Sequence, residues 1–434
     1  AVWIGIANAV IGCLVSWLVL AKRTRRMTHR LNAKTMPEFF ETRYLDRGMK
    51  IFCAIVIFIF LTPYAASVYI GLSYLFSTVF PAVPYIWWMV IMAVLTAVYL
   101  TLGGYMATVM TDFVQGIIMI FGILFVVYFV LRHDAVGGLV RGMQQLHAIP
   151  EAGKDLTSWY GGRNWFNLFS LVVLTSLGTW GLPQMIGKFY AIKDEKSIST
   201  GTIISTIFAI IISGGCYFLG GFGRLFDSPE IYDKAGGAVV YDSIIPHMLS
   251  MLPDLLIGVV VVLVLSASMS TLSSLVLTSS STLTLDLLKD NIMKKMSEKK
   301  QIVTMQVLIV FFIVVSVVIA LDPPTFIAQL MGISWGALAG AFLAPFLYGL
   351  YWKGVTRAGV WAGFITGVGL TVANMFFGFI KSPINAGAMA MIAGLLIVPF
   401  ISLITPKLKK SEIEDVFICY DEKVTITKKH SLED

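Results

Sequence analysis

The segment Ser266–Asp286 reads SASMSTLSSLVLTSSSTLTLD and decides the fold of this 434-residue chain. Twelve of its twenty-one residues are Ser or Thr. It nevertheless belongs to an apolar run from about 254 to 285, longer than the roughly 20 residues that cross a bilayer. Six small residues share one face of such a helix, because they recur at three- and four-residue steps. They are Ala267, Ser270, Thr271, Ser274, Thr278 and Ser281.

These six residues, the hydroxyl face, support two interpretations. A polar face of this length is costly against lipid, so we expect it to lie inside a bundle of helices. Ser and Thr commonly pack between membrane helices and bond back to their own i−4 carbonyls, which favours a structural role. Alternatively, the hydroxyl oxygens belong to a site that holds an ion without any charged ligand.

The composition identifies a membrane protein. Hydrophobic residues make up 57% of the chain, charged residues only 13%, and the mean hydropathy is +0.82. These values do not fit the two or three soluble domains that the length would suggest, and they exclude a disordered chain. Four scattered cysteines exclude a disulfide scaffold.

Eleven apolar runs with charges only at their ends predict eleven transmembrane helices. They cover residues 1–20, 51–79, 86–102, 113–131, 164–187, 202–223, 254–285, 302–320, 326–350, 358–380 and 385–404. Two connections on one side, 132–163 and 224–253, are long and rich in Trp, Gly and acidic residues. We expect them to carry short helices or a lid.

The basic residues predict the orientation of this bundle. When the connections are assigned to alternate sides, 25 of the 32 Lys and Arg residues fall on one side and 7 on the other. The basic side comprises residues 21–50, 103–112, 188–201, 286–301, 351–357 and the tail from 405. The positive-inside rule places this side and the C-terminus in the cytoplasm of a cell whose plasma membrane the chain crosses. The pI of about 9.1 therefore reflects orientation and not a nucleic-acid partner.

The interiors of the eleven runs lack Lys, Arg, Asp, Glu and His. Intramembrane ionisable residues mark proton relays and voltage sensors, so their absence argues against both. An ion at mid-membrane must then be held by neutral oxygens, which become available where a helix is broken around a cavity.

The fifth run contains such an irregularity, GTWGLPQ at Gly178–Gln184. The proline removes a backbone donor and the glycines loosen the helix. A simple proline kink is the structural interpretation. The functional interpretation is a discontinuous helix whose exposed peptide groups and Trp180 face a substrate.

A third cluster, YLTLGGYMATVMTDFVQG at Tyr99–Gly116, joins the third and fourth runs. Asp112 and Gln115 would lie in the first turn of the fourth helix, where the helix dipole stabilises an acid. Helix capping suffices to explain Asp112 on its own.

Other chemistry is missing from the sequence. There is no GxxxxGK[ST], HExxH or CxxC motif, and the histidines all fall in connections or the tail. Direct ATP-driven transport and an enzyme active site find no support, which leaves an ion gradient or no coupling at all.

Three segments together resemble the sodium/solute symporter family, which includes the proline permease, the pantothenate permease and the sodium/glucose cotransporters. They are YLTLGGYMATVMTDFVQGIIMIFG from Tyr99, LSASMSTLSSLVLTSSSTLTLDL from Leu265 and YWKGVTRAGVWAGFITG from Tyr351. The likeness extends from about residue 1 to 404, which we take as one transmembrane domain, with 405–434 as a cytoplasmic tail.

The resemblance implies an all-α integral membrane protein with a leucine-transporter-like core of two inverted repeats. Relatives of the proline permease have thirteen spans, so eleven suggest that two are missing. The chain starts at Ala1 without Met, which leads us to expect that the missing pair is N-terminal. The first run would then correspond to the second core helix, the fifth to the broken sixth and the seventh to the eighth.

The resemblance also assigns candidate site residues. In the family the eighth core helix gives a carbonyl and two hydroxyls to sodium, and Ala267, Ser270 and Thr271 match those positions. Asp112 matches an acid implicated in sodium passage, and Ser274 lies on the expected exit path. The candidates for the substrate pocket are Thr179, Trp180, Gly181 and Gln184.

The family's remaining sodium oxygens come from the first core helix, to which no segment of this chain corresponds. We therefore expect the chain to be a fragment that carries half of an ion site.

The function implied is sodium-coupled symport of a small organic solute by alternating access, with Na⁺ as the only coupling ion and no obligatory protein partner. The alternatives are a transporter-like sensor or receptor that acts with a separate signalling partner, and a passive channel. GTWGLPQ is closer in pattern to the proline-permease branch than to the sugar cotransporters, which favours an amino acid such as proline, or a small carboxylate.

Overall fold

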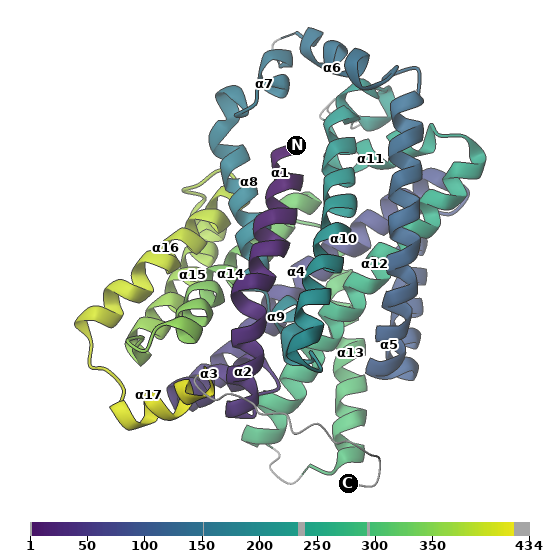
Figure 1. Cartoon of the computed structure of the whole chain (residues 1–434). Helices are drawn as coiled ribbons and strands as arrows, with labels where there is room; N and C mark the ends of the chain where they lie inside the picture. The colour runs from purple at the N-terminus through teal and green to yellow at the C-terminus, as the bar shows by residue number, and fades with distance from the viewer. Residues whose placement is uncertain (1, 151, 233–238, 293–295, 421–434) are drawn as a thin grey trace, which may run out of the picture.

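The computed structural model describes residues 2–150, 152–232, 239–292 and 296–420. In this part of the chain the secondary structure is helical, apart from one isolated β-bridge between Tyr232 and Val239 (Figure 1). The predicted all-α class is therefore confirmed. Of the tail predicted at 405–434, residues 421–434 lie outside the described residues.

Seventeen α-helices are labelled in chain order in Figure 1. They are α1 (Val2–Ala7), α2 (Lys22–Leu31), α3 (Met36–Tyr44), α4 (Arg47–Val79), α5 (Tyr85–Arg132), α6 (Leu139–Ala148), α7 (Gly153–Thr157), α8 (Trp165–Leu177), α9 (Pro183–Tyr190), α10 (Glu195–Phe222), α11 (Tyr241–Ser250), α12 (Asp254–Thr282), α13 (Glu298–Leu321), α14 (Ile327–Tyr351), α15 (Arg357–Phe377), α16 (Pro383–Ile404) and α17 (Lys410–Phe417).

Eleven helical segments of the described chain are long and apolar enough to cross a membrane, as the sequence predicted. The first runs without interruption from Val2 to Leu31, because the π-helical segments Asn8–Val15 and Trp17–Ala21 join α1 to α2. The fifth runs from Gly162 to Tyr190 and contains the break between α8 and α9.

The third and fourth spans are both parts of α5, and the expected connection at 103–112 is helical. A straight helix would put residues 99 and 111 about 18 Å apart. The Tyr99 hydroxyl nevertheless donates to Thr111 Oγ1 at 2.9 Å, so α5 bends sharply between them. Because the helix continues through this bend, Asp112 is not at a helix N-terminus. The prediction that the helix dipole stabilises Asp112 there is wrong.

Small residues allow the last three spans to pack closely. A Cβ atom on Gly336 of α14 would lie 2.6 Å from the Gly387 Cα of α16, and one on Gly340 would lie 3.1 Å from the Gly367 Cα of α15. Such close backbone approach is typical of helix interfaces in membranes. This close packing makes α14 the most deeply buried span, and the broken fifth span packs against it.

The short helix α3 is held to this group by aromatic rings. Phe40 contacts Phe364 of α15 with ring centroids 5.1 Å apart, and Phe39 contacts Phe346 of α14 at 4.9 Å. Both α3 rings are fully buried. Apolar burial therefore fixes the connection between the first two spans as firmly as a span itself.

The two ends of the bundle differ in charge. One end, here called the basic end, carries α2, α3 and α17, and the opposite end carries α6, α7 and α11 (Figure 1). The helices at the opposite end confirm the expectation of short helices in the long connections. One of them supports α14: the Asp242 carboxylate of α11 accepts hydrogen bonds from the Ile327 amide at 3.1 and 3.3 Å. Burial raises the pKa of Asp242.

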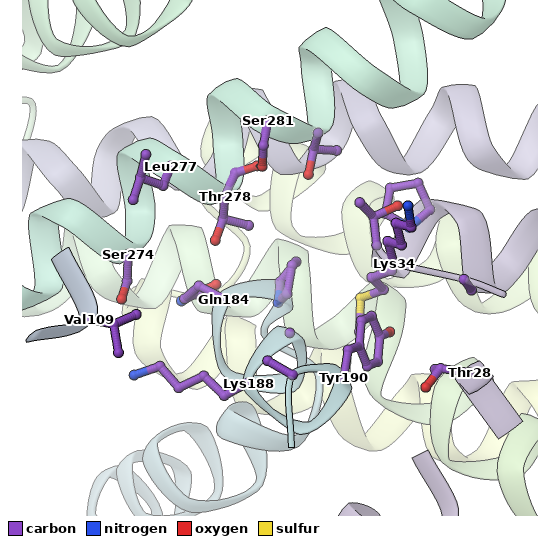
Figure 2. Close-up of a pocket in the computed structure, with 18 of the residues that line it drawn as sticks. Thr28, Lys34, Val109, Gln184, Lys188, Tyr190, Ser274, Leu277, Thr278 and Ser281 are labelled. Atoms are coloured by element: carbon purple, nitrogen blue, oxygen red, sulfur yellow. The ribbon is translucent and has the colours of Figure 1, made fainter. Parts of the chain in front are cut away.

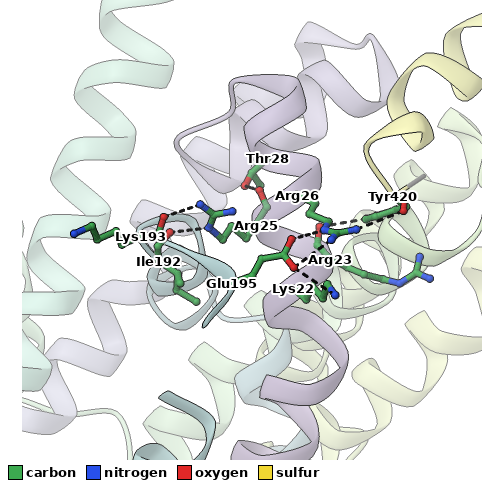
Figure 3. A network of polar contacts seen from close by, with 9 residues as sticks. All are labelled: Lys22, Arg23, Arg25, Arg26, Thr28, Ile192, Lys193, Glu195 and Tyr420. Atoms are coloured by element: carbon green, nitrogen blue, oxygen red, sulfur yellow. Dashed lines mark hydrogen bonds and ion pairs between the residues drawn. The ribbon is translucent and has the colours of Figure 1, made fainter. Parts of the chain in front are cut away.

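A network of arginines holds the basic end together (Figure 3). Arg25 of α2 donates to the carbonyls of Ile192 and Lys193, just after α9, at 2.9 and 2.7 Å. Arg26 pairs with Glu195 at the start of α10, with nitrogen–oxygen distances of 2.5 and 3.1 Å. These contacts fix the end of the broken fifth span to the end of the first.

The C-terminal segment 410–420 docks on the same helix. Arg23 of α2 lies between two tyrosine rings, 4.1 Å from the Tyr351 centroid and 4.5 Å from that of Tyr420. Arg30 pairs with Asp415 of α17 at 2.6 Å. The apolar side chains of α17, Val416 and Phe417 among them, are buried. This part of the tail is therefore a folded strap across the basic end.

Candidate functional site

A cavity of about 810 Å³ opens between five elements toward the basic end (Figure 2). Its volume falls within the range of ordinary ligand pockets. We call it the vestibule. Its walls come from the turn between α2 and α3, from α5 at the bend, from α9, from α12 and from one residue of α13. The lining residues are Thr28, His29, Asn32, Ala33, Lys34, Thr35, Met36, Pro37, Thr108, Val109, Asp112, Pro183, Gln184, Gly187, Lys188, Tyr190, Ala191, Ser274, Leu277, Thr278, Ser281, Thr282 and Met305.

The α2–α3 wall is a rigid turn. Asn32 takes a left-handed conformation, with φ of 51°, and ends α2. Thr35 then caps α3 by accepting the Glu38 amide at 3.2 Å, while Glu38 accepts the Lys34 amide at 2.7 Å. The pair resembles a capping box, except that Glu38 accepts the amide of the residue before the N-cap, and it satisfies amide groups at the start of the helix.

A buried ionic cluster ties this turn to the π-helical segment Leu283–Ile292, which follows α12. The Thr35 hydroxyl donates to Asp286 at 3.0 Å. Lys50, at the start of α4, lies 3.0 Å from Glu41 and 3.7 Å from Asp286. Lys50 is only 4% exposed and Asp286 is fully buried. Breaking such a buried pair is expensive, so the cluster fixes the mouth of the vestibule.

The α9 wall begins where the fifth span is broken. The helix α8 ends in a short 3₁₀ turn over Gly178–Trp180, and α9 starts at Pro183. A Cβ atom on Gly181 would lie 2.8 Å from the Leu343 amide nitrogen and 2.9 Å from the Ala339 Cα of α14. Gly181 is therefore required because the unwound chain touches the α14 backbone.

Gln184 and Lys188 project from α9 on one face, because they are four residues apart. Gln184 is only 5% exposed, and neither atom of its amide has a hydrogen-bond partner among the described residues. In Figure 2 it points toward Thr278 and Ser274 of α12, while Lys188 extends toward Val109 of α5. A buried amide without partners is costly, and its direction into a cavity indicates a polar ligand.

The α12 wall is the lower part of the hydroxyl face. Ser274, Thr278 and Ser281 all line the vestibule, as their three- and four-residue spacing requires. These hydroxyls therefore border a cavity inside the bundle, while the Ser281 hydroxyl also bonds back to the Thr278 carbonyl at 3.3 Å.

The upper part of the same face carries the candidate sodium residues. Ser270 and Thr271 both donate to the Ala267 carbonyl, at 3.0 and 2.9 Å. The three oxygens therefore lie together on one turn through the back-bonding that the structural interpretation expects, and none of these residues lines the vestibule. Ser274 follows Ser270 by four residues, about 6 Å along the helix, so the vestibule ends about one turn below them.

Asp112 lines the vestibule from α5, beside α12, where the Ser273 hydroxyl lies within hydrogen-bonding reach of its carboxylate. Its Oδ1 atom is buried without a hydrogen-bond partner among the described residues. No pair of acidic or metal-ligating side chains accompanies it, since the described residues contain no cluster of three His, Cys, Asp or Glu that could hold a metal. A cation here would meet one carboxylate and the hydroxyls of α12.

The pocket candidates of the fifth span separate into two groups. Trp180 donates from its indole nitrogen to the Ile11 carbonyl at 3.0 Å, and Thr179 donates to Gly12 at 3.1 Å. Both carbonyls belong to the π-helical part of the first span, where i→i+5 bonds replace the usual α-helical pattern. Thr179, Trp180 and Gly181 thus fix the break to its neighbours, and only Gln184 faces the vestibule.

Sequence reasoning missed Lys188 and the Asn32–Thr35 turn. Lys188 was counted only as a basic residue of a connection, although its spacing from Gln184 places both on one face of α9. The T-x-x-E pattern from Thr35 to Glu38 could have indicated the capped turn. Neither pattern could have indicated that α12 lies opposite.

Fold and site together define a class: a multi-helix membrane transporter with a broken helix beside a polar vestibule. The model of the sodium:solute symporter family matches residues 1–367. The chain belongs to this family, as the three sequence segments predicted.

The curated relatives of this chain are named as transporters. The osmoregulated proline transporter OpuE of Bacillus subtilis is 28% identical over 94% of this chain and 82% of its own length. Sodium/proline symporter 2 of Staphylococcus saprophyticus is 29% identical over 85% of this chain and 71% of its own. These proteins are transporters and not enzymes.

A solved sodium-coupled sialic acid symporter shares the fold, with a TM-score of 0.67 at 14% identity, over 94% of this chain and 91% of that one. The predicted leucine-transporter-like architecture is therefore confirmed.

Proposed function

We propose that this protein carries a small amino acid, with proline as the first candidate, across the cell membrane together with sodium by alternating access. One observation carries the proposal: the lower part of the hydroxyl face of α12, Ser274, Thr278 and Ser281, lines the same vestibule as the buried, unpartnered amide of Gln184. The curated relatives at 27–29% identity are named as proline transporters, which supports the choice of solute.

The turn Ala267–Thr271 supplies part of the sodium shell in this proposal. Its carbonyl and two hydroxyl oxygens converge without any charged group, which suits a monovalent cation at mid-membrane. Sodium then leaves past Ser274 and Asp112, which line the vestibule from α12 and from α5.

The solute passes along α9. Thr179, Trp180 and Gly181 keep the helix broken by their contacts with the first span and α14, and Gln184 offers its amide to the solute. Coupling requires that sodium and solute stabilise the same conformer through different contacts. The basic end faces the cytoplasm in this proposal, so the vestibule is the inner exit.

The test is sodium-dependent uptake of labelled solutes by the full-length protein in proteoliposomes. The double variant Ser270→Ala/Thr271→Ala removes two of the three oxygens, and we expect the half-saturating sodium concentration to rise at least tenfold. The control is Ser268→Ala. Around the helix axis, Ser268 lies about 100° from the mean direction of Ala267, Ser270 and Thr271. An unchanged sodium dependence in the double variant would show that the ion binds elsewhere.

A panel of amino acids, small carboxylates, vitamins and sugars identifies the solute in the same assay. Sodium-driven accumulation of proline is the expected result. Ligand-dependent complex formation with another protein, without any uptake, would instead favour a sensor.

A further inference from the structure

The vestibule contains opposite charges on facing elements. Lys188 projects from α9, and Asp112 lies on α5. Neither residue takes part in an ion pair among the described residues, although the Lys188 ammonium is within electrostatic range of the Asp112 carboxylate. Two opposite charges that line a cavity without forming an ion pair leave room for a ligand that carries both a positive and a negative charge.

Lys188, Asp112 and Gln184 line the same part of the vestibule. Figure 2 shows Lys188 extending toward Val109, and Asp112 follows Val109 by three residues, on the same face of α5. Gln184 lies one turn before Lys188 on α9. Ammonium, carboxylate and amide therefore line one part of the cavity, opposite the hydroxyls of Ser274 and Thr278.

The remaining charges of the vestibule favour a carboxylate. Lys34 lines it from the α2–α3 turn, so the lining carries two lysines and one acidic residue, Asp112. The carboxylates at its mouth, Glu41 and Asp286, are engaged by Lys50. A lining with an excess of positive charge favours the carboxylate of a ligand. The amide of Gln184 can donate to a carboxylate oxygen and accept from an ammonium group.

We propose that Lys188, Gln184 and Asp112 form a release site in the vestibule for a zwitterionic amino acid, with its carboxylate toward Lys188 and its ammonium toward Asp112. This inference rests on the proposed function and narrows its substrate class to zwitterions. It also gives Lys188 a direct role in binding the solute on its inner side.

The experiment measures proline efflux from right-side-out vesicles that contain the full-length protein. Preloaded labelled proline gives the inner half-saturating concentration, and internal prolinamide, which lacks the carboxylate, is tested as a competitor. In the wild type we expect prolinamide to compete at least tenfold more weakly than unlabelled proline. In Lys188→Gln this discrimination should fall below threefold, because the group that recognises the carboxylate is gone.

Two further variants make the result specific. Lys188→Arg keeps the charge and should restore most of the discrimination. Lys196→Gln removes an exposed lysine of α10 that does not line the vestibule, and it should discriminate as the wild type does. In Lys188→Gln the half-saturating concentration for uptake from outside should change less than the inner value.

The outcomes separate this inference from the proposed function. Equal discrimination between proline and prolinamide in the wild type and in Lys188→Gln overturns the release site, even when transport is intact. The absence of sodium-dependent proline flux in the wild type overturns the proposed solute instead.

Discussion

At the scale of one residue, Gln184 lowers the stability of the empty protein at the place where we propose that a ligand binds. Its side chain is buried, yet both polar atoms of the amide lack partners among the described residues. An unsatisfied buried polar group costs about 1–3 kcal/mol. Residues that bind ligands often destabilise the empty protein in this way.

Replacing Gln184 by leucine should therefore have opposite effects on stability and transport. The leucine side chain has a similar volume and no unsatisfied amide, so we expect a gain of about 1 kcal/mol in stability. Sodium-dependent solute uptake should fall at least tenfold. Thermal unfolding in detergent and uptake in proteoliposomes measure the two effects.

Gln306 provides the matched control, because its amide donates to the Thr101 carbonyl at 3.0 Å. Gln306→Leu removes this hydrogen bond, so it should lower the unfolding temperature. A lower unfolding temperature for Gln184→Leu as well would mean that the Gln184 amide is satisfied in the protein.

The sequence could predict single residues only where spacing along one helix was sufficient. Ala267, Ser270 and Thr271 are three and four residues apart, and their oxygens lie on one turn because both hydroxyls bond back to the Ala267 carbonyl; their assignment to sodium stays a prediction. Lys188 and Asp112 belong to helices far apart in the sequence, so no spacing connects them. Their relation depends on where α9 and α5 lie around the vestibule, which the amino-acid pattern does not specify.

At the scale of one element, the broken fifth span depends on backbone contact. The sequence GTWGLPQ allowed either a kink or a full interruption, because proline causes both. The interruption is stabilised from outside: Trp180 and Thr179 donate to carbonyls of the first span, and Gly181 lies against α14. The sequence alone could not distinguish a kink from an interruption, because these partners come from other helices.

Gly181→Ala should disrupt the break. Its Cβ atom would meet backbone atoms of α14 at 2.8 and 2.9 Å, and backbone cannot move aside as a flexible side chain can. We expect a loss of about 1–3 kcal/mol in stability and of most uptake, as overpacking usually costs. Thermal unfolding and uptake are the measurements.

Gly258→Ala in α12 is the comparison, because no heavy atom lies within 4 Å of an added Cβ there. It should be neutral or slightly stabilising, since alanine favours helices. If both variants behave alike, the close approach of Gly181 to α14 does not matter.

The helix α5 shows the limit of predicting elements from hydropathy. The dip near Gly103–Asp112 correctly separated two apolar runs, but the chain bends there as a helix and forms no loop. Glycine and polar residues lower hydropathy whether the backbone turns or stays helical. The assignment of Asp112 to a helix N-terminus failed for this reason.

At the scale of the whole molecule, eleven spans and their family could be predicted because apolar length and charge are properties of the sequence itself. The strap over 410–420 was not predicted. Its apolar residues are few and mixed with charges, and their burial depends on Arg23 and Arg30 of α2, nearly 400 residues earlier. The strap also places the described end of the chain beside the basic residues of the first connection.

The distribution of basic residues predicts how the molecule lies in its membrane. The reverse orientation would carry 25 Lys and Arg residues across the bilayer instead of 7, against a membrane potential that opposes each charge by about 2.3 kcal/mol per 100 mV. We therefore expect the basic end on the cytoplasmic side. Single cysteines, introduced after replacement of the four native ones by serine, test this.

Lys154→Cys lies in α7 at the opposite end and Lys410→Cys in α17 at the basic end, and both lysines are exposed. On intact cells a membrane-impermeant maleimide should label the cysteine at 154 and leave that at 410 unlabelled until the cells are permeabilised. A permeant maleimide should label both and serves as the control. The reverse pattern would place the vestibule on the outside, and it would then be the entrance for solute and not the exit.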